Sequence, residues 1–193
     1  MAAGQRACPR IRIRKAALQA IVLLLCASGA APQSENLSEY QVKAAFVYNF
    51  AKFVEWPAEA FADRNAPLRV CVLGENPFGQ ELMRVVNGKK IGGHDLIVSN
   101  FFEARLARGC HVLFVSSSER GRMAQVIEGL RETSVLTVGE TGDFVRQGGM
   151  IRFVLEEGKV RFEVNLGASD RARLKISSKL LSLARAVFTE GKG

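Results

Sequence analysis

The chain has 193 residues, with 27 basic and 19 acidic side chains and a formal net charge of +8. Five of the basic residues lie in the first thirty positions, so the remainder carries 22 basic and 19 acidic residues, a net charge of only +3. Nucleic-acid binding requires a concentrated basic surface, so this mild charge argues against nucleic acid as a partner.

The first thirty residues have the three parts of a secretory signal peptide. Basic residues up to Lys15 precede the apolar run "AALQAIVLLLCASGA", and Ser28 and Ala30 supply the small residues that a signal peptidase requires. The apolar run is shorter than the roughly 20 residues needed to span a bilayer. We therefore expect export, cleavage near Ala30, a flexible segment over 31–38 and one domain over 39–190.

The stretch "AAFVYNFAKFVEWP", which starts at Ala44, predicts an amphipathic helix that ends near Pro57. Its large apolar side chains recur every three to four residues and share one face: Phe46, Val47, Phe50, Phe53 and Val54. Aromatic residues at this spacing usually pack in a core, so we expect the helix to attach to a sheet. A ligand-stacking aromatic box is the alternative.

Strand and helix patterns alternate from residue 68 to residue 139. Short β-rich runs predict strands over 68–74, 94–101, 110–115 and 134–139. Helices are predicted over 76–86, with Asn76 as N-cap and Pro77 at the first helical position, and over 116–130, where serines provide the cap. The alternation is typical of an α/β fold, so we expect a single domain with a mainly parallel sheet flanked by helices.

The segment "GGMIRFVLEEGKVRFEVNL" predicts a β-hairpin that turns at Glu157-Gly158. In this register one face pairs apolar residues: Ile151 with Val164, Phe153 with Phe162 and Leu155 with Val160. The opposite face pairs opposite charges: Arg152 with Glu163 and Glu156 with Lys159. Agreement between the two faces fixes the register.

The last part of the domain, "ASDRARLKISSKLLSLARAVF", is predicted to be one long amphipathic helix. Its expected buried stripe is Ile176, Leu180, Leu183 and Val187. Its expected basic ladder, at four-residue spacing, is Arg171, Lys175 and Lys179. Because like charges at this spacing repel unless an acidic group faces them, the ladder is a candidate for binding; plain solvation is the alternative.

Four cysteines are present, of which two leave with the signal peptide. An exported protein then keeps an even number, Cys71 and Cys110, which favours a disulfide. The competing hypothesis is a zinc site that combines these cysteines with His94 and His111, although the short ligand pairs usual for zinc are missing.

The loops "GENPFG", "SSSE" and "GETG" each follow a predicted strand, so they would gather in the crevice where parallel α/β sheets bind small molecules. The first of them lacks the lysine and hydroxyl of a phosphate-binding loop, and no Ser-His-Asp or metal-ligand pattern is visible. We therefore predict turn glycines and helix caps here, with no catalytic residue, metal or cofactor.

Several blocks of the sequence resemble one family. "KAAFVYNFAKFVEWP" is similar to the opening of the YfiR family of bacterial periplasmic regulators. The resemblance continues in order through "VCVLGENPFG", "CHVLFVS", "VLTVGE", "GGMIRFV", "VRFEVNL" and "LKISSKLLSLA". It covers nearly the whole chain after the signal peptide.

The resemblance implies a periplasmic protein, often a homodimer, with a sheet flanked by helices. It implies a regulator without catalysis, which holds a membrane-bound diguanylate cyclase inactive until an envelope or redox cue and which a related outer-membrane lipoprotein sequesters. Cys71 and Cys110 match the family's disulfide. The family's second cysteine pair, near the positions of Val145 and Arg152, is missing here, which places redox control through that bond in doubt.

A regulator of this kind is expected to expose an apolar patch rimmed by charge, built from the hairpin edge and the last helix. Its partner would be the periplasmic part of an inner-membrane signalling protein, a diguanylate cyclase or a sensor kinase. The candidate partner- or ligand-binding residues are Glu163, Arg171, Lys175, Arg152, Asn165 and Met150. The alternative is a periplasmic small-ligand binding module that feeds a sensor kinase and would need a concave pocket.

Overall fold

The computed structural model describes residue 1 and residues 33–189, so the predicted signal peptide lies outside the described residues. A compact unit begins at Asn36. The first described helix begins at Gln33, so residues 33–38, which the sequence analysis assigned to a flexible segment ahead of the domain, are helical. Within the described part of the chain, no helix combines the length and hydrophobicity needed to cross a membrane.

The strands and helices alternate through most of the domain, as the sequence predicts. The strands are β1 Val54–Glu55, β2 Leu68–Leu73, β3 Lys90–Ile91, β4 His94–Phe101, β5 Val112–Val115, β6 Leu136–Gly139, β7 Ile151–Glu156, β8 Lys159–Asn165, β9 Lys175–Ile176 and β10 Ala186–Phe188. The helices are α2 Gln33–Lys52, α3 Glu81–Val86, α4 Met123–Gly129, α5 Leu166–Arg171 and α6 Ser178–Leu181, with 3-10 helices η1 Ala58–Ala60, η2 Ala104–Gly109 and η3 Ser117–Arg122.

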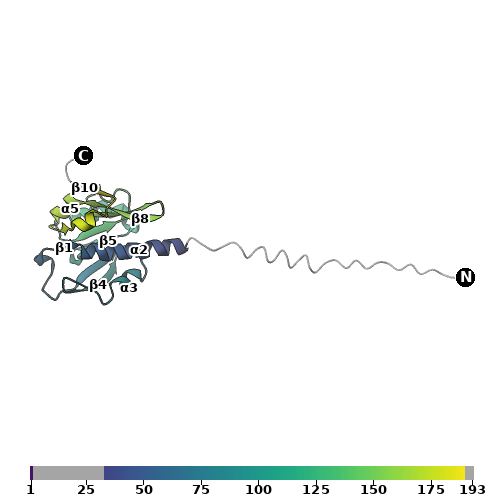
Figure 1. Ribbon diagram of the computed structural model, residues 1–193, viewed down its shortest axis with the longest axis horizontal. Coiled ribbons are helices and arrows are strands. Elements are labelled where there is room, and N and C mark those ends of the chain that lie inside the picture. Colours follow the sequence, from purple (N-terminus) through teal and green to yellow (C-terminus); the bar gives the residue numbers. More distant parts are fainter. Residues whose placement is uncertain (2–32, 190–193) are drawn as a thin grey trace. The chain divides into compact units, whose positions relative to one another are not determined.

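Within residues 33–189, eight strands form one sheet in the order β10-β8-β7-β6-β5-β2-β4-β3. Strands β4, β2, β5, β6 and β7 run parallel to one another, whereas β8 is antiparallel to β7 and β3 to β4. In Figure 1, β10 and β8 lie at the upper end of the domain, and β4 and α3 lie at the lower end. The predicted α/β fold with a mainly parallel sheet is confirmed.

The two faces of the sheet belong to two separate cores, because successive strand residues point in opposite directions. Val70 and Val72 join a core that α2 covers together with α3, α5 and α6. Cys71 and Leu73 join a core covered by η2 and α4. The sheet therefore has helices on both faces, which explains why its central strands are apolar throughout.

The aromatic side chains of α2 pack in the core, so the core interpretation of the opening stretch is confirmed. Phe50 is fully buried. Its ring centroid lies 5.5 Å from that of Phe153 and 5.0 Å from that of Phe162, which belong to the two strands of the hairpin. Phe46 adds an edge contact with Phe162 at 5.5 Å. These aromatic pairs attach α2 to the β7–β8 end of the sheet.

The hairpin has the predicted register. Ile151 pairs with Val164, Phe153 with Phe162, Leu155 with Val160, Arg152 with Glu163 and Glu156 with Lys159. The two turn residues, Glu157 and Gly158, have φ angles of 50° and 71°. Left-handed backbone at both central positions is typical of the two-residue turns whose twist matches that of the strands.

The predicted long C-terminal helix is wrong. Residues 166–188 instead form α5, β9, α6 and β10 in succession. Arg173 has a φ of 58°, which no right-handed helix contains, and Ser177 caps α6 by accepting from the N–H of Lys179. The expected stripe is also broken, because the side chains of Leu183 and Val187 are 64% and 41% exposed.

Tertiary contacts explain why this segment does not stay helical. β9 pairs with β1 through Val54–Ile176 and Glu55–Lys175. β10 pairs with β8, with Val187 opposite Val164. The segment thus supplies hydrogen-bond partners to β1 and to the outer side of β8, which a single helix would leave unsatisfied.

The predicted helix over 76–86 begins later than expected, at Glu81. Asn76 caps a turn instead: its side-chain oxygen accepts from the N–H of Phe78, and its amide donates to the carbonyl of Gly79. Gly79 has a φ of 55°, so the chain cannot be helical through this position.

The hairpin turn gives a test of the backbone argument. Glu157→Asn should raise the free energy of unfolding by about 0.5–1 kcal/mol, because Asn adopts left-handed backbone at a lower cost than Glu. Urea denaturation measures the change. The control is Glu157→Ala, which removes the same charge without favouring this backbone; an equal gain from Ala would contradict the turn explanation.

Candidate functional site

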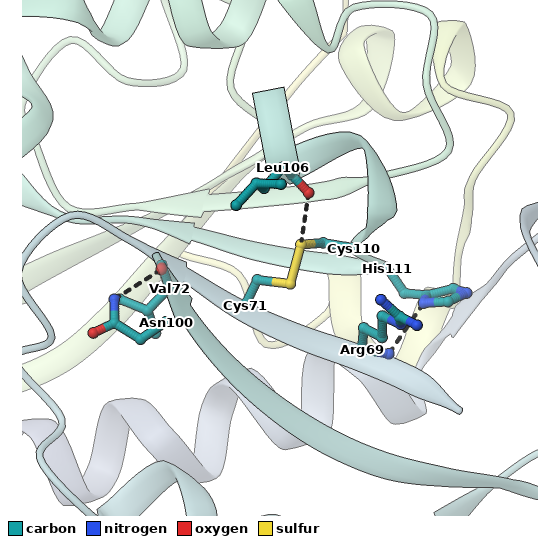
Figure 2. The surroundings of a disulfide bond; sticks show 7 residues. All are labelled: Arg69, Cys71, Val72, Asn100, Leu106, Cys110 and His111. Atoms are coloured by element: carbon teal, nitrogen blue, oxygen red, sulfur yellow. Dashed lines mark hydrogen bonds between the residues drawn. A yellow bond between two sulfur atoms is a disulfide. The ribbon is translucent and has the colours of Figure 1, made fainter. Parts of the chain in front are cut away.

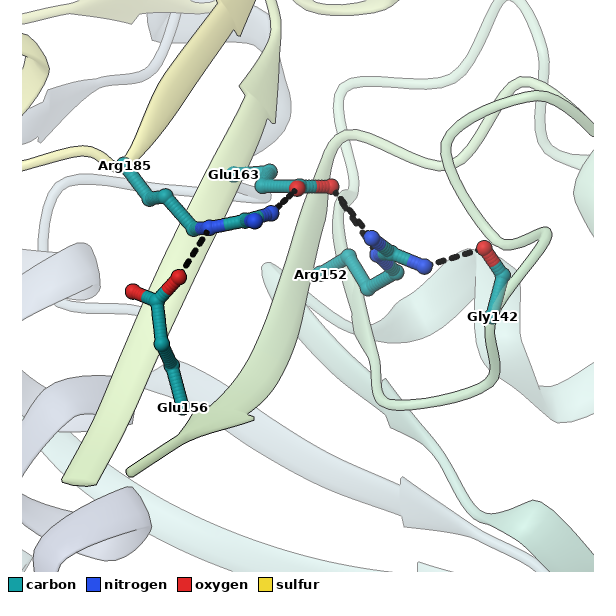
Figure 3. A network of polar contacts seen from close by, with 5 residues as sticks. All are labelled: Gly142, Arg152, Glu156, Glu163 and Arg185. Carbon is teal, nitrogen blue, oxygen red and sulfur yellow. Dashed lines mark hydrogen bonds and ion pairs between the residues drawn. The ribbon is translucent and has the colours of Figure 1, made fainter. Parts of the chain in front are cut away.

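Glu163 is the most deeply buried carboxylate of the hairpin, with 3% of its surface exposed. One oxygen lies 2.7 Å from a guanidinium nitrogen of Arg152, on the neighbouring strand β7. The other lies 2.7 Å from Arg185, which directly precedes β10. Arg185 also bonds to Glu156 at 3.1 Å (Figure 3). The buried charge therefore has two cationic partners, as a stable buried carboxylate requires.

This network ties the last strand to the hairpin. The main-chain N–H of Arg185 donates to the carbonyl of Phe162 while its side chain reaches Glu163. A hydrogen bond to Glu156 and, with a smaller effect, one to Glu163 raise the pKa of Arg185 above its ordinary value. Glu163 thus lies inside the domain, with two arginines on its oxygens, and does not have the exposed rim position that the docking hypothesis gave it.

A loop over residues 140–149, next to which the resemblance implied a second cysteine pair in the family, is held by polar contacts. Arg152 donates to the carbonyl of Gly142 (Figure 3). Asn165 donates to the carbonyl of Val145 at 3.0 Å. The ring of Phe144 fills the space over Gly149, where an added Cβ would lie 2.2 Å from it. Hydrogen bonds and a buried ring thus fix this loop without a covalent link.

The other predicted binding residues are distributed among several elements. Asn165 caps α5 by accepting from the N–H of Ala168. Met150 is in the core, 3% exposed. Arg171 is half-buried at the end of α5, and Lys175 is exposed on β9. With Lys179 on α6, the three basic residues are spread over three elements, so they do not form the expected ladder along one helix.

A buried charge cluster that the sequence analysis missed joins α2 to the end of β6. Lys43 is 5% exposed and lies 2.6 Å from a carboxylate oxygen of Glu140. It also pairs with Glu39, one turn earlier in α2. The hydroxyl of Tyr40 donates to Glu140 at 3.0 Å, and burial, with the charge of Glu140, raises the pKa of Tyr40. Lys43 lies four residues before Val47, on the buried stripe, which is the signal that could have revealed it.

The three loops at the carboxyl ends of β2, β5 and β6 lie where the sequence predicts. The N–H of Glu75 donates to the hydroxyl of Ser118 at 3.0 Å. An added Cβ on Gly74 would lie 2.4 Å from the same hydroxyl oxygen. Thr141 bonds to Met123 of α4. The loops pack against one another and against helices, so side chains of the domain occupy this edge of the sheet.

Cys71 and Cys110 form a disulfide with Cα atoms 6.0 Å apart (Figure 2). Cys71 lies in the middle of β2, and Cys110 caps the end of η2. The bond therefore attaches η2 to the sheet. It also overturns the zinc hypothesis, because the sulfurs bind each other. No cluster of three or more potential metal ligands occurs among the described residues.

His94 and His111 both stack on the ring of Phe61, at centroid distances of 3.9 and 4.4 Å. The N–H of Arg69 donates to Nδ1 of His111 (Figure 2). Burial lowers the pKa of His111 below its usual 6.5, and the nearby carbonyl of Ala60 only partly opposes this effect. The competing hypothesis treated His94 and His111 as zinc ligands. In the structure both rings instead pack against the ring of Phe61.

Four apolar side chains of the hairpin and the C-terminal segment are 41–64% exposed, and we call them together the C-terminal edge surface: Leu155, Leu183, Val187 and Phe188. Val187 and Phe188 are consecutive residues of β10, so they point to opposite faces of the sheet and flank its edge. Within residues 33–189, β10 is the last strand of the sheet, and no strand pairs with its outer side. The surface thus combines apolar side chains with an open strand edge.

Comparisons with known proteins agree with this fold. Residues 40–185 match a family model described as YfiR/HmsC-like. A conserved domain protein from Vibrio cholerae O1 biovar El Tor is 10% identical, with a TM-score of 0.53 over 77% of this chain. An ABC domain from Streptococcus pneumoniae, solved in complex with L-Trp, is 7% identical, with a TM-score of 0.51 over 78%. The chain spans 60% of each of those two, and at these identities they show the fold alone. No curated protein gives a sequence match.

The disulfide is predicted to stabilise the fold. It closes a loop across a sequence separation of 39, for which the chain-entropy model gives at most about 4 kcal/mol. Replacing both cysteines by serine should lower the melting temperature. Wild-type protein treated with reductant should then melt at the same temperature as the double variant. Thiol labelling of denatured, unreduced protein is the independent check, and two reactive thiols would disprove the bond.

Removing the charge of Glu163 is predicted to destabilise the domain more than removing the charge of Glu156. Glu163→Gln should cost about 2–4 kcal/mol in unfolding free energy, because two arginines lose a buried counter-charge. Glu156→Gln, which removes an exposed carboxylate from the same Arg185, should have a small effect. Chemical denaturation compares the two variants. Equal losses of unfolding free energy in the two variants would contradict the claim that the buried carboxylate contributes more to stability than the exposed one.

Proposed function

Because this chain belongs to the YfiR/HmsC-like family, we propose that it is a periplasmic regulator of cyclic di-GMP signalling. It binds the periplasmic part of an inner-membrane diguanylate cyclase, restrains that enzyme and carries out no catalysis itself. Export is supported by the signal-peptide pattern of the first thirty residues. An outer-membrane lipoprotein that sequesters the regulator would be its second partner.

The docking surface in this proposal is the C-terminal edge surface, and it is the observation that carries the proposal. Val187 and Phe188 place exposed apolar groups on both sides of the same strand edge, and exposed apolar groups that lie together mark interaction sites. The open side of β10 adds main-chain donors and acceptors, which an extended partner segment can pair with. The partner expected there is therefore an extended segment with apolar side chains.

Charged residues border this surface without covering it. Arg185 and Glu156 are 42% and 45% exposed and bond to each other. An apolar centre with a polar rim is the usual composition of a protein interface. Binding energy would then come from the apolar side chains and the strand edge, and the rim would influence association rate and orientation.

The arrangement of polar groups supports a role without catalysis. At the carboxyl edge of the sheet, where α/β folds hold substrates, the loop after β2 bonds to the loop after β5, and the loop after β6 bonds to α4. The buried charges there are held in pairs, with Lys43 bound to Glu39 and Glu140. Such pairing fixes α2 to the loop after β6.

The proposal is tested by the double variant Val187→Ser with Phe188→Ser. Both side chains are partly exposed, so the melting temperature should change little. Crosslinking to the membrane cyclase should weaken, and cyclic di-GMP should rise towards the level of the gene deletion. Mass spectrometry of crosslinked membranes identifies the partner, and cyclic di-GMP is quantified from the same cells.

The matched control is Met83→Ser with Ile97→Ser, which removes two exposed apolar side chains, 49% and 39% exposed, on α3 and β4. Equal losses in both variants would place the docking surface elsewhere. Unchanged cyclic di-GMP in the gene deletion would refute the cyclase as partner, and a crosslinked sensor kinase would replace it. A crosslinked second copy would make β10 a dimer edge.

A further inference from the structure

A cavity of about 490 Å³ lies between η2 and α4, on the side of the sheet that holds the disulfide. Its lining comes from Ala104, Arg105, Arg108, Arg122, Gln125, Val126, Gly129 and Leu130. The volume is in the range of small-molecule sites. The C-terminal edge surface contributes no residue to it, so its function can be separated from partner docking.

The cavity has a basic wall and no acidic lining residue. Three of its eight lining side chains are arginines, and none is Asp or Glu. Arg105 is held by Glu103 at 2.6 Å, and Arg122 pairs with Glu119. Among the described residues, Arg108 has no carboxylate partner and donates to the carbonyl of Gly129 at 3.2 Å. The wall therefore has an uncompensated positive charge at Arg108.

These guanidinium groups retain donors for a ligand. Each guanidinium has five N–H groups in a planar fork, and the contacts of Arg108 and Arg105 use only part of them. A forked donor matches the two oxygens of a carboxylate or phosphate. The three arginines together are suited to an oxyanion.

Contacts within the domain hold η2 and the guanidinium of Arg122 before any ligand binds. The disulfide attaches the end of η2, which carries Arg105 and Arg108, to β2. Arg122 donates to the carbonyl of Phe102 as well as to Glu119, and this orients its guanidinium. Preorganised donors lose less conformational entropy on binding, so they favour affinity.

The floor of the cavity is apolar. Val126 and Leu130 line the cavity and belong to the core under α4, and their exposed fractions of 5% and 4% leave a small apolar area for a ligand to contact. A ligand that contacts both floor and wall needs an apolar body next to its charged group. From this geometry we propose that the cavity binds a small organic anion, in which a carboxylate or phosphate bonds to the arginines and an apolar group covers Val126 and Leu130.

Binding is tested by calorimetry with benzoate, phenyl phosphate and inorganic phosphate, using the mature protein. The two aromatic anions should bind more tightly than inorganic phosphate, and added salt should weaken all three. Arg108→Gln should weaken the aromatic anions by about tenfold or more, because a charge-assisted bond is lost. In NMR spectra, the amides of residues 104–110 and 122–130 should shift on binding.

The matched control is Arg161→Gln, which removes an exposed arginine of β8 far from the lining residues. Its affinity for each anion should equal that of the wild type. Equal weakening by the two variants would overturn the proposal in favour of general charge attraction. Absence of binding by both aromatic anions would also overturn it, as would amide shifts confined to other residues. The outcome is independent of whether the membrane partner is a cyclase.

Discussion

The buried carboxylate of Glu163 is the constraint on which the C-terminal half of the domain depends. A carboxylate with 3% exposure is stable only beside opposite charge. The chain supplies that charge from both sides, with Arg152 on β7 and Arg185 before β10. Because Arg185 reaches Glu163 only when β10 lies against β8, the ion network and the strand pairing require each other. The same Arg152 holds the loop after β6 through Gly142.

Much of the fold could be predicted because its signals are local. The hairpin register follows from two faces of one short segment, and the central strands follow from apolar runs between turns. The long C-terminal helix could not be corrected in this way. Its apolar spacing fits a helix, but Arg185 bonds to a residue 22 positions earlier. Pairing at that distance overrides helical periodicity. Ser177, which caps α6, is only a weak sequence signal for a break in the helix, and the left-handed backbone of Arg173 is visible only in the structure.

The candidate site was harder to predict, since the position of a charge in the sequence does not show whether it is buried. The cross-strand pair of Arg152 with Glu163 was predicted and is confirmed. Both residues were also candidates for partner binding, and the structure shows Glu163 buried inside the domain. Lys43 was missed because its partner Glu140 lies 97 residues away. The cavity arginines come from η2 and η3, which are separate in the sequence, and their positions side by side follow from the tertiary fold. The sequence analysis expected an apolar patch at the hairpin edge and the last helix; the exposed apolar side chains there are Leu155 on β7, Leu183 after α6, and Val187 and Phe188 on β10.

In the two proposals the domain has two separate surfaces, the C-terminal edge surface and the arginine-lined cavity. The network around Glu163 holds β10 in place, and in the proposed function β10 is the strand that meets the partner. The disulfide attaches η2 to the sheet, and in the proposed anion site η2 and η3 supply the arginines. In each case an interaction inside the domain positions the groups that face outward.

Hydrogen–deuterium exchange in Glu163→Gln tests the central claim, that this carboxylate holds β10 on the sheet. If the account is correct, the amides of residues 186–188 and of the loop 140–149 exchange faster in the variant, while those of β2 and β5 keep their protection. Unchanged protection of β10 in the variant would contradict it.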